Sequence, residues 1–206
     1  MEAATPPAVV TESDYPLRFD VEYPEKLSHW KVLLKWLFAI PQFIVVYLLQ
    51  IVLGVMVFIA FFAILFTKRW PQGMWDFAVQ IERWTANVVV YGWLLMRDEY
   101  PPFNGEPGQY PVTYELDQPQ ELSRWLIFVK WLLIIPHLIV LAFVWLAGAV
   151  VVFIAFFAIL FTGRYPRGMF DFLVGAMRWS LRVNAYGYVP FGGWLQADRY
   201  PPFSLR

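Results

Sequence analysis

The sequence predicts an all-α integral membrane protein built as a tandem duplication of a two-helix membrane unit, with four spans expected. Two observations carry this prediction. Hydrophobic residues make up 59% of the 206-residue chain and charged residues only 16%, whereas a typical soluble domain is less apolar and more charged. The apolar decapeptide FIAFFAILFT also occurs twice without a change, at 58–67 and 153–162.

The repeat extends over nearly the whole chain at a constant spacing. Tyr15-Pro16 aligns with Tyr110-Pro111, and Lys35-Trp36 aligns with Lys130-Trp131. The second copy then inserts a VPFGG run before both copies close on one tag, DEYPPF at 98–103 and DRYPPF at 198–203. A fixed period of this kind indicates duplication of a structural unit. We therefore divide the chain into a disordered tail (1–14), a first membrane repeat (15–103), a linker (104–109) and a second membrane repeat (110–206).

Each repeat opens with a short β-like arm, LRFDVEY from Leu17 and VTYELD from Val112. Apolar and polar residues alternate in both arms as in a half-buried strand, so the two arms could pair with each other. An interfacial amphipathic segment follows, SHWKVLLKW from Ser28 and SRWLIFVKW from Ser123. Its aromatic and basic side chains are expected to anchor it among lipid headgroups; they are Trp30, Lys35, Trp36, Trp125, Lys130 and Trp131.

The long apolar runs, 40–66 and 135–161, are predicted to be transmembrane helices. The stretch 41–66 carries no charge and exceeds the roughly 20 residues that cross a bilayer. Pro41 and Pro136 stand at the start of each run, where a helix tolerates proline in its first turn or at a kink. The runs end at the turns TKRWPQG and TGRYPRG.

A mixed helix closes each repeat, MWDFAVQIERWTANVVVYGWLLM in the first and MFDFLVGAMRWSLRVNAYGY in the second. Copies this similar are expected to share one orientation in the membrane, which requires an even number of crossings per copy. Two crossings follow if the mixed helix spans after the apolar run. The alternative folds the apolar run into a hairpin and leaves the mixed helix in the interface, at the cost of unsatisfied backbone in hydrocarbon.

Polar residues form a stripe along one face of the mixed helix. They are Asp76, Gln80, Arg83 and Asn87 in the first copy and Asp171, Arg178 and Arg182 in the second. Charges at bilayer depth cost a few kcal/mol unless they are paired or hydrated, so the stripe should face protein, with pairs such as Asp76 with Arg178 and Asp171 with Arg83. It is interpreted as a structural network, as a hydrated path for an ion or polar ligand, or as the polar face of a helix lying flat in the interface.

The rest of the composition narrows the function classes. The formal charge is zero, so no field attracts nucleic acid. Cysteine is absent, and the two histidines, His29 and His137, align with Arg124 and Gln42 and not with each other. No catalytic or nucleotide-binding motif is present. We therefore expect no catalytic residues, no metal, no cofactor and no enzymatic activity.

Three stretches, KWLLIIPHLIVL, FIAFFAILFTGRYPRGMFDFLVGAMRW and DRYPPFSL, resemble a family of bacterial membrane proteins known as domain of unknown function four-three-eight-nine. The resemblance covers both copies, 15–103 and 110–204. The first copy departs from the pattern, with Lys68 in the place of Gly163 and Gln42 in the place of His137. The resemblance implies a multi-pass protein of the bacterial inner membrane and brings no activity or cofactor with it.

These observations favour a non-enzymatic membrane protein, a scaffold or accessory subunit of a membrane complex or homo-oligomer. Its expected partners are the lipid bilayer and other membrane subunits or a second copy of itself. The alternative is a small channel or transporter that uses the polar stripe.

Overall fold

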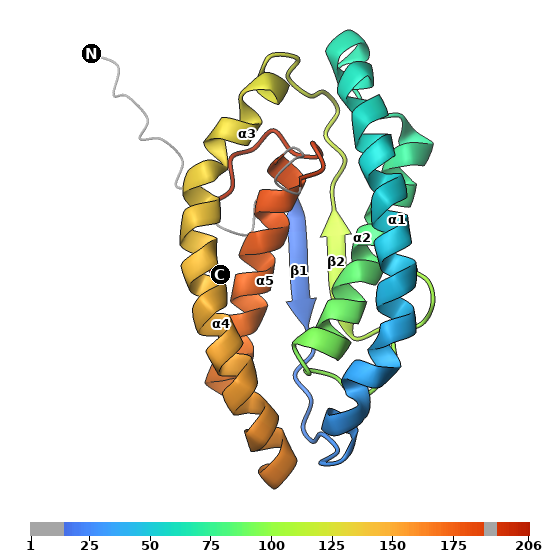
Figure 1. The fold of residues 1–206 in the computed structure, drawn as a ribbon. Helices are drawn as coiled ribbons and strands as arrows, with labels where there is room; N and C mark the ends of the chain where they lie inside the picture. Colours follow the sequence, from blue (N-terminus) through green and yellow to red (C-terminus); the bar gives the residue numbers. More distant parts are fainter. Residues whose placement is uncertain (1–14, 188–192) are drawn as a thin grey trace, which may run out of the picture.

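A computed structural model describes residues 15–187 and 193–206 of the chain. The predicted tail, 1–14, and most of the VPFGG insertion lie outside the described residues. The remainder is mostly helical, and its two copies form one interlocked structure in which two strands of a small sheet lie against four principal helices (Figure 1).

The two apolar runs each form one long helix, α1 (Lys31–Thr67) and α4 (Ile135–Thr162). Neither run folds into a hairpin. In the first copy the helix continues through Pro41 into the amphipathic segment. In the second copy this segment breaks into a 3₁₀ turn (Leu126–Phe128) and a short helix α3 (Lys130–Leu133), and Pro136 lies in the first turn of α4, where its missing N–H costs no helical hydrogen bond.

The mixed helices are α2 (Gln72–Val88), which continues into a π-helical turn at Val89–Trp93, and α5 (Arg167–Tyr186). Pro71 and Pro166 precede them in extended conformation and start each helix after the turn. Among the described residues, only the two helical stretches Lys31–Thr67 and Lys130–Thr162 are long and apolar enough to cross a membrane. The structure is therefore mostly helical with two helices suited by length and composition to a membrane.

The two arms pair, as predicted, into an antiparallel ribbon of β1 (Leu17–Val21) and β2 (Val112–Leu116). Phe19 lies opposite Tyr114 at the centre of the ribbon. These two residues are also equivalent positions of the repeat, because both copies align at a spacing of 95 residues. A local two-fold axis that exchanges the copies therefore passes through this pair.

The two copies run in opposite directions. Antiparallel pairing of equivalent arms requires this relation, and Figure 1 shows α1 and α4 antiparallel to each other. The copies are therefore antiparallel and not parallel to each other, because similarity of sequence fixes the structure of a copy and leaves open its direction relative to the other copy. Each arm also lies on the mixed helix of the other copy, β1 on α5 and β2 on α2.

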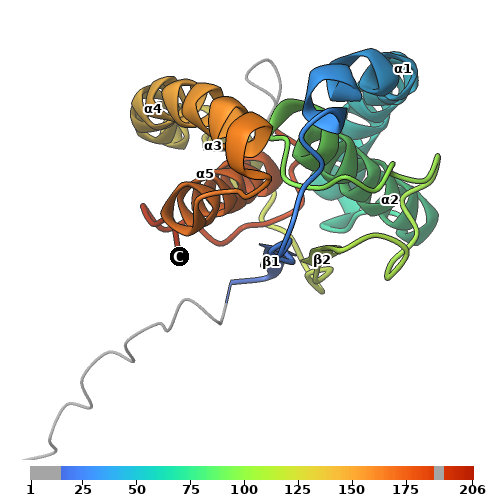
Figure 2. The same cartoon turned by 90° about the horizontal axis from the view of Figure 1, so that it is seen from below.

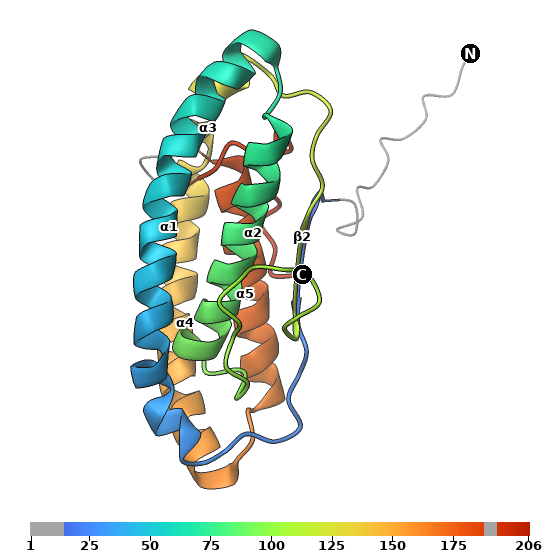
Figure 3. The same ribbon diagram turned by 90° about the vertical axis from the view of Figure 1, so that its right-hand side faces the viewer.

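The elements form three layers (Figures 2 and 3). The long helices α1 and α4 form one outer layer, α2 and α5 lie in the middle, and the ribbon covers the opposite side. The inward side chains of the ribbon, such as Leu17 and Val112, are buried in the core. Its outward side chains, such as Arg18 and Glu115, are exposed. One broad face of the molecule is thus apolar and the other polar.

Candidate functional site

The polar stripe faces the ribbon, and its arginines bind the backbone of the arms. Arg83 Nε donates to the carbonyl of Tyr114 at 2.9 Å, and Arg178 Nε donates to the carbonyl of Phe19 at 2.8 Å. Arg83 also donates to the carbonyl of Gly105 at 2.8 Å. These arginines therefore fix the central pair of the ribbon, which lies on the local two-fold axis.

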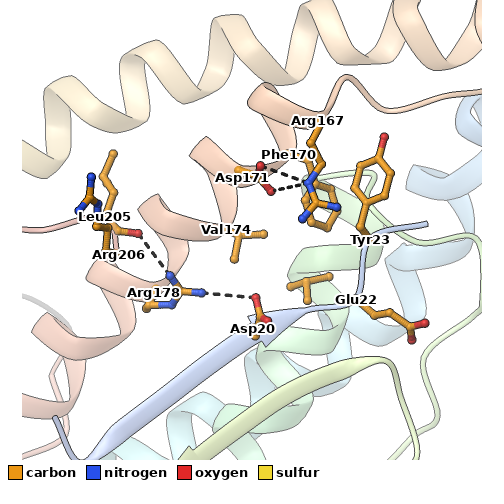
Figure 4. A pocket seen from close by; sticks show the side chains of 11 residues that line it. Asp20, Glu22, Tyr23, Arg167, Phe170, Asp171, Val174, Arg178, Leu205 and Arg206 are labelled. Atoms are coloured by element: carbon orange, nitrogen blue, oxygen red, sulfur yellow. Dashed lines mark hydrogen bonds and ion pairs between the residues drawn. The ribbon is translucent and has the colours of Figure 1, made fainter. Parts of the chain in front are cut away.

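The surroundings of Arg178 form an open cleft between α5 and the edge of β1 (Figure 4), with a volume of about 530 Å³. Arg178 reaches Asp20 at 3.3 Å, and Arg167 pairs with Asp171 one helical turn away at 3.1 Å. The guanidinium of Arg167 also lies 4.5 Å from the ring centre of Tyr23. The cleft is lined by ion pairs that are already complete, and most of them are exposed.

Neither of the expected pairs, Asp76 with Arg178 or Asp171 with Arg83, forms. Asp171 is paired within its own helix, and Asp76 accepts a hydrogen bond from Gln72 at 2.9 Å. Both aspartates are exposed, one turn after the starts of α2 and α5. The antiparallel relation of the copies explains the difference, because each stripe arginine reaches the arm of the other copy and not its mixed helix.

The remaining stripe residues lie at different depths. Gln80 is half-buried, whereas Asn87 and Arg182 are buried. The Arg182 guanidinium lies 5.6 Å from the ring centre of Tyr15, whose hydroxyl donates to the carbonyls of Arg182 and Arg199 at 3.3 and 3.1 Å. The stripe thus joins the N-terminal arm to α5 and to the C-terminal segment.

The predicted interfacial anchors divide into two groups. The four tryptophans, Trp30, Trp36, Trp125 and Trp131, are exposed, between 42% and 79%. The two lysines are not at the surface: Lys35 is 1% and Lys130 0% exposed. Each ammonium group is held by the aspartate of its own tag, Lys35 by Asp98 at 2.9 Å and Lys130 by Asp198 at 2.7 Å.

These ion pairs attach each PPF tag to the amphipathic segment of its own copy, which lies in α1 in the first copy and in α3 in the second. The Asp98 carboxylate also accepts from the Ser28 amide at 2.6 Å. Burial raises the pKa of Asp98, but the Lys35 ammonium and the Ser28 amide outweigh burial and hold it below its usual value. The interaction recurs in the second copy, where the Ser123 amide donates to Asp198.

The two histidines have separate environments. His137 is buried, and its Nδ1 accepts from the indole of Trp179 at 3.0 Å. Gln42, the equivalent residue, accepts from the indole of Trp84 at 2.7 Å. The shared task of accepting an indole N–H explains why either residue fits this position. His29 contacts the carbonyl of Leu160 at 2.8 Å. In the described part of the chain, no three His, Asp or Glu side chains are grouped as metal ligands.

A second cluster, which the sequence analysis did not single out, surrounds the buried carboxyl group of Glu82. This residue is 4% exposed and lies on α2 behind the centre of the ribbon. The hydroxyl of Tyr114 donates to it. The amide nitrogen of Gln196, oriented toward the carboxyl group, donates to both of its oxygens at 3.0 and 3.2 Å. Burial raises the pKa of Glu82 to about 8, and the Tyr114 hydrogen bond only partly offsets this effect.

Glu82 also lines an open cavity of about 480 Å³ between the long helices and the mixed helices. The signal for this residue was present in the repeat. Its equivalent in the second copy is Met177, and an acid that replaces a thioether in a buried position requires partners. Those partners, Tyr114 and Gln196, come from distant segments and carry no recognisable spacing.

Comparison with known families shows to which family the two repeats belong. The family model described as Domain of unknown function (DUF4389) matches residues 29–104 and 124–204. The chain belongs to the DUF4389 family. It is a tandem two-copy member, as the resemblance implied. Each DUF4389 unit runs from the long helix to the PPF tag, and both strands of the ribbon lie outside the matched regions. No curated protein and no solved structure matches the chain.

Proposed function

We propose that the protein is a non-enzymatic membrane scaffold or accessory subunit that lies lengthwise in one side of the bilayer. In this placement α1 and α4 are embedded in hydrocarbon, and the ribbon points into water, where it is available to a partner subunit. The observation that carries the proposal is the opposition of an apolar face, formed by the long helices, to a charged face, formed by the ribbon.

The exposed surface of the long helices is apolar along their whole length. On α1 the exposed large apolar side chains begin at Leu33 and continue to Phe66, and on α4 they continue to Phe161. The stretch of α1 from Leu33 to Phe66 is about 50 Å long, whereas the hydrocarbon core is only about 30 Å thick. An upright α1 would leave apolar side chains in water at one end or both. A helix that lies along the bilayer keeps all of them in lipid.

The position of the ribbon also supports the lengthwise placement. It lies alongside the helices, level with their middle (Figure 1), and its outward side chains include Arg18, Asp20 and Glu115. If the helices stood upright, these charges would lie near the middle of the bilayer, at a cost of a few kcal/mol each. In the lengthwise placement they lie in water.

The local symmetry gives a third argument. Equivalent motifs of similar sequence are suited to the same environment, such as the exposed Trp30 and Trp125. With the helices upright, the antiparallel copies would place these motifs on opposite sides of the membrane. With the helices lengthwise, the two-fold axis stands along the membrane normal, and both copies place their motifs at the same depth.

Cysteine accessibility tests this placement, and the chain contains no cysteine of its own. In sealed vesicles, Asp20→Cys and Glu115→Cys should both react with an impermeant maleimide from one and the same side. Ile51→Cys and Leu146→Cys, on the exposed faces of α1 and α4, should resist the reagent. A fluorophore attached to either cysteine should be quenched by spin-labelled lipid. Failure of both ribbon positions to react, as expected if the helices stood upright with the ribbon at mid-bilayer depth, would overturn the placement.

The scaffold role has its own test. A photoreactive amino acid at Arg18 or Thr113, on the outer face of the ribbon, should give a discrete protein adduct in cells. The same group at Ile51 should give lipid adducts only. Adducts to protein from Ile51 and none from the ribbon would refute the role assigned to the ribbon.

A small channel or transporter is the second candidate, and the position of Glu82 favours it. Antiparallel repeats with a polar site at their interface are a common plan of secondary transporters. Flux through liposomes would then depend on Glu82, and Glu82→Met would abolish it. Under the scaffold proposal, liposomes that contain the wild type and liposomes that contain Glu82→Met have the same permeability. The stripe arginines do not support a path, because Arg83 and Arg178 are committed to the ribbon backbone.

A further inference from the structure

The cavity beside Glu82 lies on the local two-fold axis. Its lining includes residues from both copies at equivalent positions, and three such pairs carry the argument: Gln50 with Trp145, Glu82 with Met177, and Thr85 with Ser180. Only a cavity on the axis is lined by the same positions of both copies. The ribbon closes one end of the axis, and the opposite end leads between α1 and α4.

The chemistry of this region is not symmetric. Glu82, Tyr114 and Gln196 form a polar trio at its inner end, whereas the equivalent residues are Met177, Phe19 and Met96. The symmetry-related positions thus show that three apolar residues can fill such a site within the same fold. Burying a carboxyl group costs stability even when it is hydrogen-bonded. The packing of the fold therefore does not require Glu82, Tyr114 and Gln196 to be polar. Hydrogen bonding to a ligand would explain why they are.

The hydrogen-bonding groups of the cavity select the ligand's head. The hydroxyl hydrogens of Thr85 and Ser180 are used, because both donate to carbonyls of their own helices at 2.8 Å. The side-chain amide of Gln50 donates to Thr85 at 2.9 Å. Ser180 also accepts from the indole of Trp145 at 2.8 Å. The oxygens of Gln50, Thr85 and Ser180 still have accepting capacity, Glu82 adds a carboxyl group, and Asn184 adds an amide that can donate and accept. In the described part of the lining there is no Lys, Arg or His. The site therefore suits a head that carries no negative charge and both donates and accepts hydrogen bonds, as a hydroxyl group does.

An apolar groove of about 740 Å³ continues from the cavity and shares Phe43, Trp93 and Trp145 with it. Its walls come from α1 and α4, and include Val152 and Phe156. The groove belongs to the apolar face that we place in the bilayer. A hydrocarbon chain can leave the membrane core through it while its head reaches the polar end.

We infer that the cavity and groove bind one single-chain membrane amphiphile with a hydroxyl head, of the monoacylglycerol type. The head lies among Gln50, Thr85 and Glu82, and the chain lies between α1 and α4. This inference rests on the membrane placement under the proposed function for the source of the ligand, but binding itself is measurable in detergent, without a bilayer.

The test uses the full chain in detergent micelles and 1-monooleoylglycerol as the probe, with binding measured by native mass spectrometry. Oleate, which has the same chain and an anionic head, is the matched competitor. We expect 1-monooleoylglycerol to bind at least about tenfold more tightly than oleate, a difference that one or two hydrogen bonds supply. Equal binding of the two would overturn the choice of head.

Two variants test the site. Glu82→Met with Tyr114→Phe and Gln196→Met gives the polar trio the residues of the symmetry-related positions, so that the fold has a precedent for each residue. It should weaken binding of 1-monooleoylglycerol about tenfold. Ala149→Trp, in the groove wall, should block the chain and leave the polar trio intact. Unchanged binding by both variants would overturn the inference. Arg18→Ala, on the ribbon, is the control that keeps full binding.

The two proposals fail separately. If the ribbon cysteines do not react with the impermeant reagent while 1-monooleoylglycerol still binds in micelles, the placement is wrong and the ligand site stands. If the cysteines react from one side and the probe does not bind, or binds no better than oleate, the ligand site is wrong and the placement stands.

Discussion

Tyr114 donates a hydrogen bond from the centre of the ribbon to the buried carboxyl group of Glu82. The two residues belong to different copies of the repeat, and both lie near the local two-fold axis. Burial also raises the pKa of the Tyr114 hydroxyl well above its ordinary value, and the adjacent carboxyl group contributes. The pair therefore links the ribbon directly to the wall of the open cavity between the two copies.

The stability of the protein should depend on the protonation of Glu82. Its pKa is raised from 4.5 to about 8 in the folded state, so between these pH values the folded state binds a proton that the unfolded state releases. The contribution of Glu82 to stability is therefore fully present below about pH 4.5 and decreases as the pH rises toward 8, by about 1.4 kcal/mol per pH unit. The measurement is the free energy of unfolding in detergent between pH 5 and 8.

The control for this prediction is Glu82→Gln, which cannot ionise. The difference in unfolding free energy between wild type and variant isolates the carboxyl group, because all other titrating groups are common to both. This difference should shift steadily against the wild type as the pH rises. A difference that is constant across the window would contradict a buried, protonated Glu82.

The ion pair of Lys130 with Asp198 should contribute far more than the exposed pairs. Lys130 is 0% exposed, so Lys130→Met leaves the Asp198 charge without its partner and should lower the unfolding free energy by up to about 3 kcal/mol. Arg18→Met, which removes an ion pair with Glu115 on the outside of the ribbon, should cost less than about 1 kcal/mol. Chemical denaturation of both variants provides the comparison.

The double variant Lys130→Met with Asp198→Asn sharpens this prediction. Removing both charges should recover part of the loss, since the unpaired carboxylate causes most of it. If the double variant loses more unfolding free energy than the two single variants lose together, the Asp198 carboxylate has a further role besides the ion pair.

Much of this fold could be predicted from particular residues. The repeated FIAFFAILFT fixes the long helices, the alternation in LRFDVEY and VTYELD fixes the arms, and their pairing is confirmed. The direction of the second copy could not be predicted, because a repeat gives spacing and no orientation. The antiparallel register of the ribbon is what sets it.

The candidate site was predicted in part. Helical periodicity placed Arg83 and Arg178 on one face of each mixed helix, and that face does lie against protein. Their acceptors are backbone carbonyls of the arms, which no side-chain pattern identifies. The recurrence of Lys35 and Asp98 as Lys130 and Asp198 did contain the signal for the buried ion pairs, because both charges are kept in both copies.

The arginines should hold the ribbon in place. Arg83→Ala and Arg178→Ala each remove charge-assisted hydrogen bonds to the ribbon and should each destabilise the protein by about 1.5–3 kcal/mol. Replacement by lysine should recover little, because one ammonium group cannot reproduce the fork of donors that reaches Tyr114 and Gly105 together. Hydrogen exchange at the amides of the ribbon is the direct measurement. Faster exchange in the alanine variants is expected, and exchange that is fast throughout the molecule would instead indicate global unfolding.

The ends of the two long helices provide the last prediction. Lys68 and Gly163 occupy equivalent positions and adopt left-handed backbone conformations, with φ of 61° and 65°. This conformation costs a residue with a Cβ atom about 1–2 kcal/mol, so Lys68 is strained and Gly163 is not. A Cβ atom at 163 would also come within 2.9 Å of His29 Nε2 and 3.1 Å of the Leu27 carbonyl oxygen.

Gly163→Ala should therefore lower the unfolding free energy by about 1–2 kcal/mol. Lys68→Gly should raise it by up to about 1 kcal/mol, because relief of strain outweighs the loss of an exposed ion pair with Glu121. Lys68→Ala separates the two effects, since it removes the ion pair and keeps the Cβ atom. If Lys68→Gly and Lys68→Ala have the same stability, the left-handed cap is not strained, and the ion pair alone accounts for the residue at this position.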